Sequence, residues 1–256
     1  MSGGRRRFLG KNERLTDSEN KAKVGVGESL VSPESAQSRL ASLPKGVTLG
    51  QVRAHPAGRL PSGNPRFDQL VGGGFPRARL SEVVGSTSSG RTSLAYRLLA
   101  STTRRQEMAA LVDCRDRFEP RSAEAAGIRL SRLLWVRPRD ERETLRCSEI
   151  LIGTEGLGLV VLDLADGLSP IAAARFATAW PRLARQAAAS KVTLVLLSRE
   201  RLAGSSAALC VVLRGGRPLW PRHMLRDTLF EGIVSRAEVM RLRGEARPEQ
   251  PIELCS

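Results

Sequence analysis

Short apolar runs alternate along most of this chain with segments of helical periodicity. Such runs, bounded by turn residues, predict buried strands. Five of them are expected to form the centre of the fold: Val83-Val84, Met108 to Val112, Leu133 to Val136, Leu157 to Leu162 and Val192 to Leu197. Strands that alternate with helices in this way predict an α/β fold, in which a mainly parallel sheet is covered by helices on both faces.

Helix start signals stand between the predicted strands. Asp140, with Glu143 three residues later, fits a capping box, and Ser169-Pro170 offers an N-cap followed by proline at the first helical position. A third helix is expected directly after Gly90, with an apolar face drawn from residues 94–99. Pro181 lies inside the helix predicted to follow Ser169, so we expect a kink or a division there.

The chain changes character at both ends. Residues 1–30 have little periodic hydrophobicity and predict a disordered basic arm, and residues 31–54 predict a leading helix, starting at Ser32-Pro33, and a linker. One globular domain is expected over residues 55–243, followed by a flexible tail over residues 244–256. Near the end of the domain, three strand-like runs predict antiparallel strands at the sheet edge: Ala208 to Leu213, Thr228 to Val234 and Ala237 to Leu242.

Basic residues outnumber acidic ones. The chain has 41 Lys and Arg against 26 Asp and Glu, a formal net charge of +15. This surplus either draws the protein to polyanions such as nucleic acid or reflects arginine-rich coding in a GC-rich genome, and the sequence leaves both explanations open. Any contacts with DNA are expected to be nonspecific phosphate contacts. The candidates in the basic arm are Arg5, Arg6, Arg7, Lys21 and Lys23.

Cysteine and histidine patterns do not predict a metal site. The four cysteines include no C-x-x-C pair, and the chain has only two histidines. No apolar run reaches the roughly 18 residues that a membrane-spanning helix needs. We therefore expect reduced thiols, no structural metal, no membrane partner and a cytoplasmic, nucleoid-associated protein.

Residues 85–93 carry the main candidate chemistry. A glycine-rich loop between a strand and a helix surrounds phosphates with backbone N–H groups, while a lysine reaches the β and γ phosphates and a Thr or Ser hydroxyl binds Mg²⁺. Here Arg91 stands in the lysine position, and its broad, planar guanidinium is not a conservative replacement. If a nucleotide binds, the residues expected to hold it are Gly85, Ser88, Ser89, Gly90, Arg91, Thr92, Ser93 and Asp163.

Asp163 follows the apolar run that ends at Leu162. Its carboxylate would hold the water shell of a metal, so that Thr92 and Asp163 would be the residues at Mg²⁺; the alternative is a bond to a nearby helix start. ATP with Mg²⁺ is the cofactor that such a loop would take, and none is expected to be required.

An ordered series of motifs resembles the RecA superfamily. The resemblance covers roughly residues 55–213 and implies a RecA-like P-loop fold. Its segments are Arg59 to Gly63, Phe67 to Leu70, Gly72 to Pro76, Glu82 to Gly85, Leu111 to Asp116 and Glu119-Pro120.

Three arginines stand where this resemblance implies the functional residues of an ATPase. It implies a lysine at Arg91, a water-activating glutamate at Arg115 and a glutamine that senses the γ-phosphate at Arg199. Arginine cannot accept a proton near neutral pH. We therefore expect no hydrolysis by the family's mechanism, unless Asp116 or Glu119 serves as the base.

The charged groups around the loop are expected to pair with one another. Arg91 and Arg115 would face Asp113 and Asp163 at the strand ends, because opposed charges in a partly buried site satisfy each other. The protein's own side chains would then fill the space that phosphates need.

Two connections are shorter than the resemblance implies. In the recombinases, long loops that grip DNA follow the strands that end near Asp163 and Arg199. Here residues 166–168 lead almost directly into the helix at Ser169-Pro170, and residues 200–206 leave only a short connection. The sequence thus predicts that the strand-exchange loops are missing.

Taken together, these features look like the ImuA family, RecA-fold accessory proteins of the bacterial SOS mutagenesis cassette. That resemblance implies a non-catalytic adaptor in translesion DNA synthesis, with an ImuB-like protein, an error-prone polymerase and RecA itself as partners. Two alternatives stay open. The glycine frame, Thr92 and Asp163 would suit a nucleotide-dependent DNA-binding ATPase of the RecA or RadA type, and a third interpretation is a SulA-like inhibitor of cell division.

Overall fold

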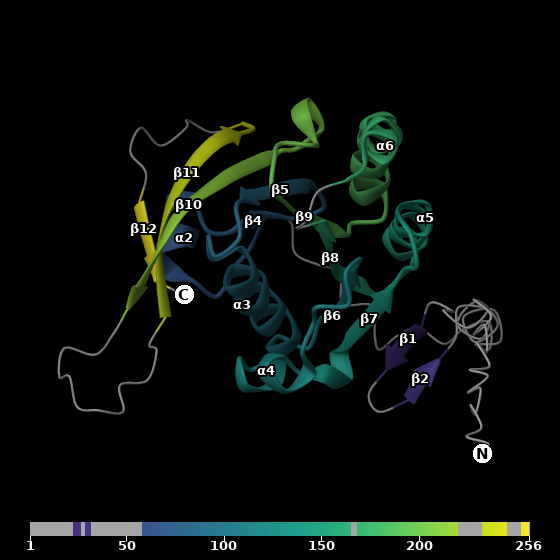
Figure 1. Cartoon of the computed structure of the whole chain (residues 1–256), viewed down its shortest axis with the longest axis horizontal. Coiled ribbons are helices and arrows are strands. Elements are labelled where there is room, and N and C mark those ends of the chain that lie inside the picture. The colour runs from purple at the N-terminus through teal and green to yellow at the C-terminus, as the bar shows by residue number, and fades with distance from the viewer. Residues whose placement is uncertain are drawn as a thin grey trace, which may run out of the picture.

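The computed structural model describes residues 23–26, 29–31, 58–164, 168–219, 232–244 and 252–255. These residues form a sheet of ten strands with helices on both faces, together with a small sheet of two strands (Figure 1). The strands are β1 (Lys23–Val26), β2 (Ser29–Val31), β3 (Arg59–Leu60), β4 (Phe75–Pro76), β5 (Leu80–Gly85), β6 (Met108–Asp113), β7 (Leu133–Arg137), β8 (Leu157–Leu164), β9 (Thr193–Ser198), β10 (Leu209–Leu219), β11 (Gly232–Leu242) and β12 (Ile252–Cys255).

The helices follow the strands in alternation over most of the chain. They are α2 (Pro65–Leu70), α3 (Arg91–Arg104), α4 (Pro120–Ala125), α5 (Glu141–Ile152) and α6 (Pro170–Ala189), with the short 3-10 turns η1 (Leu130–Arg132) and η2 (Gly204–Ser206). None of the helices in the described ranges is long and apolar enough to cross a membrane.

The middle of the large sheet is parallel and its edges are antiparallel. Strands β10, β5, β9, β8, β6 and β7 lie in that order and run in the same direction. At one edge β11 and β12 add antiparallel strands, and at the other β1 and β2 do so. The predicted α/β fold is confirmed, including all five central strands and antiparallel strands near the C-terminus. The first of the three runs predicted as antiparallel, Ala208 to Leu213, differs from the expectation, because it lies in β10, which is parallel to β5 and antiparallel only to β11.

Alternate residues of the central strands pack on opposite faces of the sheet. On β8, Leu159 and Val161 join the core beneath α3, whereas Val160 and Leu162 join the core beneath α5 and α6. Figure 1 shows α3 and α4 on one side of the sheet and α5 and α6 on the other. All four side chains are fully buried, as expected for a parallel strand that is covered on both faces.

The predicted helix starts at Asp140 and Ser169 are confirmed. The carboxylate of Asp140 accepts a hydrogen bond from the Glu143 amide at 2.7 Å, and the hydroxyl of Ser169 accepts one from the Ala172 amide at 3.3 Å. The predicted division at Pro181 is wrong, because α6 continues through it to Ala189. Pro181 itself is exposed, and the neighbouring side chains of Trp180 and Leu183 are buried in the core and hold the helix against the sheet on both sides of the proline.

Both chain ends differ from the expectation where the structure describes them. Within the predicted arm, β1 pairs with β7 and β2 pairs with β1. Arg5, Arg6, Arg7, Lys21 and the predicted leading helix lie outside the described residues.

The flexible tail predicted over residues 244–256 is corrected at residues 252–255. These form β12, which pairs with β11 and buries Leu254. Ile252, Glu253 and Leu254 alternate between apolar and polar residues, and this pattern could have predicted the strand from the sequence.

The runs predicted as two separate strands after residue 228 are also corrected. Residues 232–242 form the single strand β11, and residues 228–231 lie outside the described part of the chain. Strand β11 follows β10 through register shifts near Cys210 and between Arg214 and Arg217. Such irregularities allow one strand to continue across a sequence that does not alternate cleanly.

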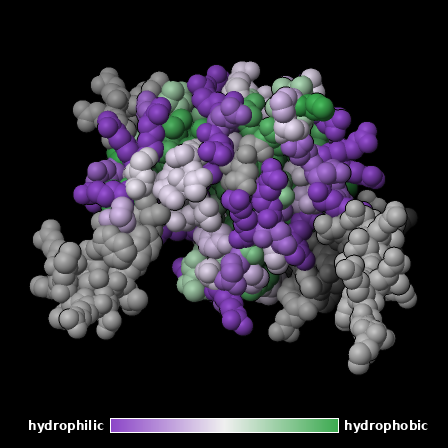
Figure 2. Space-filling model, in the orientation of Figure 1, coloured by the Kyte–Doolittle hydropathy of each residue, from purple (hydrophilic) through white to green (hydrophobic). Residues whose placement is uncertain are grey.

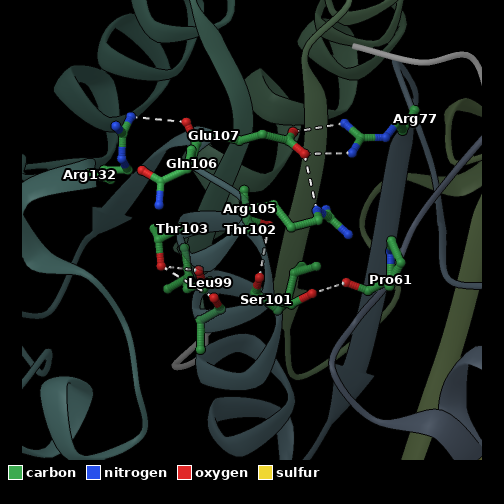
Figure 3. A network of polar contacts seen from close by, with 12 residues as sticks. Pro61, Arg77, Leu99, Ser101, Thr102, Thr103, Arg105, Gln106, Glu107 and Arg132 are labelled. Atoms are coloured by element: carbon green, nitrogen blue, oxygen red, sulfur yellow. Dashed lines mark hydrogen bonds and ion pairs between the residues drawn. The ribbon is translucent and has the colours of Figure 1, made fainter. Parts of the chain in front are cut away.

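A buried polar network ties together the edge of the sheet where the parallel strands begin, which we call the amino edge (Figure 3). Arg77, just before β5, donates two hydrogen bonds to the carboxylate of Glu107, just before β6, at 2.9 and 2.8 Å. Arg105 donates a third to the same carboxylate at 3.2 Å. The side chains of Arg77 and Glu107 are 7% and 13% exposed. This network fixes the turn before β5 against the turn before β6.

Candidate functional site

The glycine-rich loop connects the end of β5 to the start of α3, at the opposite, carboxyl edge of the sheet. Gly85 ends β5 where a Cβ atom would lie 2.8 Å from the carbonyl oxygen of Leu213 on the neighbouring strand β10, so no side chain fits there. Gly90 adopts φ 87° at the N-cap of α3, a conformation that favours glycine. The Ser89 amide donates to the Ser86 carbonyl at 3.2 Å and closes the loop between them.

The start of α3 has the electrostatic character of an anion site. The N-cap Gly90 has no side chain to accept from the first amides, and no acidic residue lies in the first turn. Arg91 lies there instead and adds a positive charge to the positive end of the helix dipole. This combination is unfavourable without a negative group nearby and favourable with one.

A cavity of about 290 Å³ lies in front of the loop. We call it the loop cavity. Its volume is close to the lower limit of small-molecule sites. All of the predicted nucleotide-binding residues line it except Gly85, which directly precedes the loop. Its lining consists of Ser86, Thr87, Ser88, Ser89, Gly90, Arg91, Thr92, Ser93, Ala95, Tyr96, Leu99, Leu111, Asp113, Arg117, Phe118, Asp163 and Leu197.

The arginines of the site are partly different from those predicted. Arg91 lines the loop cavity and is 7% exposed. Arg115 lines a separate cavity, and Arg199 is exposed after β9 and lines neither. Arg117, which sequence reasoning missed, lines the loop cavity instead. Arg115 thus lines the other cavity, and the loop cavity is open in front of the loop. The expected pairing of Arg91 and Arg115 with the carboxylates at the strand ends stays a prediction.

Asp113 explains why Arg115 and Arg117, although close in sequence, line different cavities. Its buried carboxylate accepts hydrogen bonds from the backbone amides of Arg115 at 3.3 Å and Phe118 at 2.8 Å, and from the indole of Trp135 at 3.2 Å. The chain after β6 is thus wound around this carboxylate. The Asp113 carboxylate is bound by these N–H groups, rather than by the guanidinium groups that we predicted.

Aromatic rings form one wall beside the loop cavity. Tyr96 and Phe118 line the cavity, with ring centroids 5.7 Å apart, and Phe118 packs against Trp135 at 5.2 Å. Burial raises the pKa of the Tyr96 hydroxyl, and the nearby Asp113 carboxylate raises it further, although a hydrogen bond from the Glu119 amide acts in the opposite direction. Tyr96 is therefore a neutral hydroxyl at physiological pH.

A second cavity of about 240 Å³ lies at the start of α5. Its lining residues are Cys114, Arg115, Arg139, Asp140, Glu141, Thr144, Leu164 and Leu168. Burial raises the pKa of the Cys114 thiol to about 12, so this cysteine is not a nucleophile at neutral pH. Hydrogen bonds from the Ser169 hydroxyl and amide lower the pKa of Glu141.

The carboxylates that could replace a missing general base do not line the loop cavity. Asp116 pairs with Arg137 at 3.0 Å. Glu119 is the N-cap of α4, where its carboxylate accepts from the amides of Arg121 and Ser122. Those bonds, above all the one from the Ser122 amide, lower the pKa of Glu119. Both groups are thus engaged in holding the turn and the helix that follows.

Asp163 is the carboxylate that the structure does bring to the loop. It lies beside Asp113 in the register of β8 and β6, and both line the loop cavity with Thr92. A hydroxyl and a carboxylate around one cavity are the oxygen ligands that Mg²⁺ takes together with water and phosphate. The described residues contain no cluster of three or more His, Cys, Asp and Glu side chains that could hold a metal by themselves.

The two short connections predicted at this edge are confirmed. Strand β8 ends at Leu164 and α6 begins at Pro170. Residues 199–208 connect β9 to β10 and contain η2. The buried carboxylate of Glu82 holds this second connection through bonds from the Leu202 and Ala203 amides, at 2.6 and 3.1 Å.

Comparison with known proteins places these features in a family. The model of the RecA N-terminal domain family matches residues 43–193. The chain is 32% identical over 124 residues to RecA of Picosynechococcus sp., a match that covers 48% of this chain and 36% of that protein. It is 34% identical over 112 residues to RecA of Lactobacillus delbrueckii subsp. bulgaricus, with 43% and 34% covered, and 32% identical over 125 residues to RecA of Corynebacterium urealyticum, with 48% and 34% covered. The chain therefore spans about a third of the length of these curated relatives.

Proposed function

Because this chain belongs to the RecA N-terminal domain family, we propose that it is a RecA-fold adaptor, which binds other proteins and does not hydrolyse ATP. The observation that carries the proposal is the placement of the turn after β6. The position implied for the water-activating glutamate is Arg115, which lies in the second cavity. The nearby Asp116 and Glu119 are engaged with Arg137 and with the start of α4. General-base catalysis needs a group within hydrogen-bond reach of the attacking water.

The finer part of the proposal is the process in which the adaptor acts. We propose that it works in translesion DNA synthesis during the SOS response to DNA damage. Its partners would be an ImuB-like protein, an error-prone polymerase and RecA, with nonspecific contacts to DNA. Supporting this role are the two short connections at the carboxyl edge, because a chain without the long DNA-gripping loops is suited to binding proteins rather than to strand exchange.

A nucleotide-dependent DNA-binding ATPase is the second candidate. The loop cavity favours it, since Thr92 and Asp163 lie around the same space as the first-turn amides of α3. The same features suit an adaptor that binds a nucleotide without turning it over. Hydrolysis therefore separates the two candidates, whereas nucleotide binding does not.

The first test is phosphate release by the purified chain with Mg-ATP and single-stranded DNA. The adaptor proposal expects no release above that of buffer, both for the native chain and for the Arg91→Lys variant. Restoring the lysine improves phosphate contact without supplying a base. Sustained turnover that is lost in Asp163→Ala would refute the adaptor proposal.

The second test addresses the process. Deletion of the gene is expected to lower the frequency of mutations induced by DNA-damaging radiation, and Asp163→Ala is expected to restore that frequency as well as the native chain does. If the deletion leaves induced mutation unchanged, the role in translesion synthesis is wrong, whatever the phosphate assay shows.

A further inference from the structure

Helices α5 and α6 pack side by side and are fixed to each other at both ends. The Ser169 amide, at the start of α6, donates to the carboxylate of Glu141 on α5 at 2.8 Å. Towards the other end, Arg182 forms an ion pair with Glu149, and the Gln186 side chain donates to the Glu149 carbonyl at 2.8 Å. The two helices therefore present one continuous outer surface, on the side of the sheet away from α3 (Figure 1).

This outer surface carries the exposed large hydrophobic side chains of the described residues. They are Ile150 on α5, which is 40% exposed, and Ile171 on α6, which is 76% exposed. The aromatic residues of α6, Phe176 and Trp180, are 0% and 1% exposed and belong to the core. The two isoleucines are thus exposed on helices whose other large apolar side chains are mostly buried.

The same surface has an excess of positive charge. Helix α6 contains three arginines and no Asp or Glu. The acidic residues of α5 are engaged within the chain: Glu141 with Ser169, Glu143 with the Arg139 amide and Glu149 with Arg182. By contrast, four arginine side chains of the pair have no ion-pair partner among the described residues: Arg142, Arg146, Arg175 and Arg185.

Helical spacing combines these groups into two stripes. Arg142, Arg146 and Ile150 follow one another at intervals of four residues on α5 and lie on one side of that helix. Ile171 and Arg175 share a side of α6 with Arg182, which contacts α5 through Glu149. We call the surface formed by the two stripes the α5–α6 face. In Figure 2, apolar atoms lie over α6 and are bordered by hydrophilic groups that extend over α5.

We propose that the α5–α6 face binds an acidic segment of a protein partner, one in which apolar side chains alternate with carboxylates. The arginines would pair with the carboxylates, and Ile150 and Ile171 would be buried by the apolar side chains. Burial of an exposed isoleucine is favourable, and arginine is suited to carboxylate recognition. The inference rests on the proposed adaptor function for the existence of a partner, and it assigns that partner a surface.

The apolar groups favour a protein segment over nucleic acid. A phosphate backbone would use the arginines but would leave Ile171 in contact with water or with phosphate. Single-stranded nucleic acid also gains affinity by stacking on exposed aromatic rings, and the aromatic rings of these two helices are buried. An acidic peptide with apolar side chains satisfies both parts of the face.

The test is titration of the full chain with a fluorescent synthetic peptide that alternates Glu and Asp with leucine at helical spacing. The peptide is expected to bind, and Ile171→Asp and Arg175→Glu are each expected to weaken it by roughly tenfold. The matched control is Arg121→Glu, on exposed α4 across the sheet, and it should bind as the native chain does. Because the altered side chains are exposed, each variant should keep the native melting temperature.

Three results would overturn the inference. They are no binding of the peptide, equal weakening by Arg121→Glu, and equal binding of a control peptide whose leucines are replaced by serine. A labelled thymidine oligonucleotide of similar charge is included: if it binds more tightly than the peptide and Arg175→Glu abolishes this, the face binds nucleic acid. Failure of these titrations leaves the adaptor function standing, because damage-induced mutation frequency is measured independently of them.

Discussion

The two edges of the parallel sheet both contain buried arginines, but they use them differently. At the amino edge, the buried guanidinium of Arg77 is held by both oxygens of Glu107. At the carboxyl edge, Arg91 and Arg117 line a cavity beside the uncapped start of α3. Arginine therefore holds two turns together through Glu107 at one edge and lines an open cavity at the other, which is the edge where parallel α/β sheets generally bind their ligands.

The largest expected effect is at the amino edge. Glu107→Gln removes the charge that compensates the buried Arg77, and such a loss costs about 3–5 kcal/mol. Asp116→Asn is the matched change at the carboxyl edge. It breaks the pair with Arg137, in which the Asp116 side chain is 59% exposed, and it should cost only about 0–1 kcal/mol. Urea unfolding measures the free energy of unfolding of each variant. Equal losses in the two variants would contradict the expected difference between the amino and carboxyl edges.

An intermediate effect is expected from an anion at the loop cavity. Pyrophosphate at ten times its dissociation constant should raise the free energy of unfolding by about 1.4 kcal/mol, because it binds only the folded chain. Arg117→Gln and Arg91→Gln should each lessen this gain, while Arg121→Gln on α4 should retain it. The comparison is made at constant ionic strength with sodium chloride. A gain that is the same in all variants would show that the anion acts elsewhere.

The smallest effect concerns the bond between α5 and α6 at the carboxyl edge. Ser169→Ala removes an N-cap and should cost about 1 kcal/mol. Glu141→Gln should cost less, and its effect should depend on pH. Bonds from Ser169 lower the pKa of Glu141, so its contribution is complete above the ordinary glutamate pKa of about 4.3 and is lost as the pH falls through the lowered value. Unfolding at pH 6 and at lower pH should show the difference between Glu141→Gln and native chain shrinking; a constant difference would contradict this.

Sequence patterns predicted the fold more completely than the site. Local signals specify strands and helix starts: the carboxylate of Asp140 and the hydroxyl of Ser169 cap the helices where the pattern placed them. The glycine-rich loop was equally predictable, because its shape follows from backbone requirements at Gly85 and Gly90.

The placement of the arginines around the loop was not predictable from spacing. Residues 114–118 belong to a turn, in which the period of two that holds in strands does not apply. Asp116 has φ 53°, and the Asp113 carboxylate winds the chain around itself. These contacts, between residues whose partners are not evident in the sequence, bring Arg117 to the loop cavity and take Arg115 away from it.

The hold of Glu82 on the connection between β9 and β10 has a consequence for how anything recognises that part of the surface. With the amides of Leu202 and Ala203 bound to a buried carboxylate, the backbone is already ordered before an encounter. A molecule that docks there meets a preorganised shape, loses little conformational entropy from this side and associates as one rigid body with another. Slow hydrogen–deuterium exchange at these two amides would show that the backbone of this connection is ordered in the free protein.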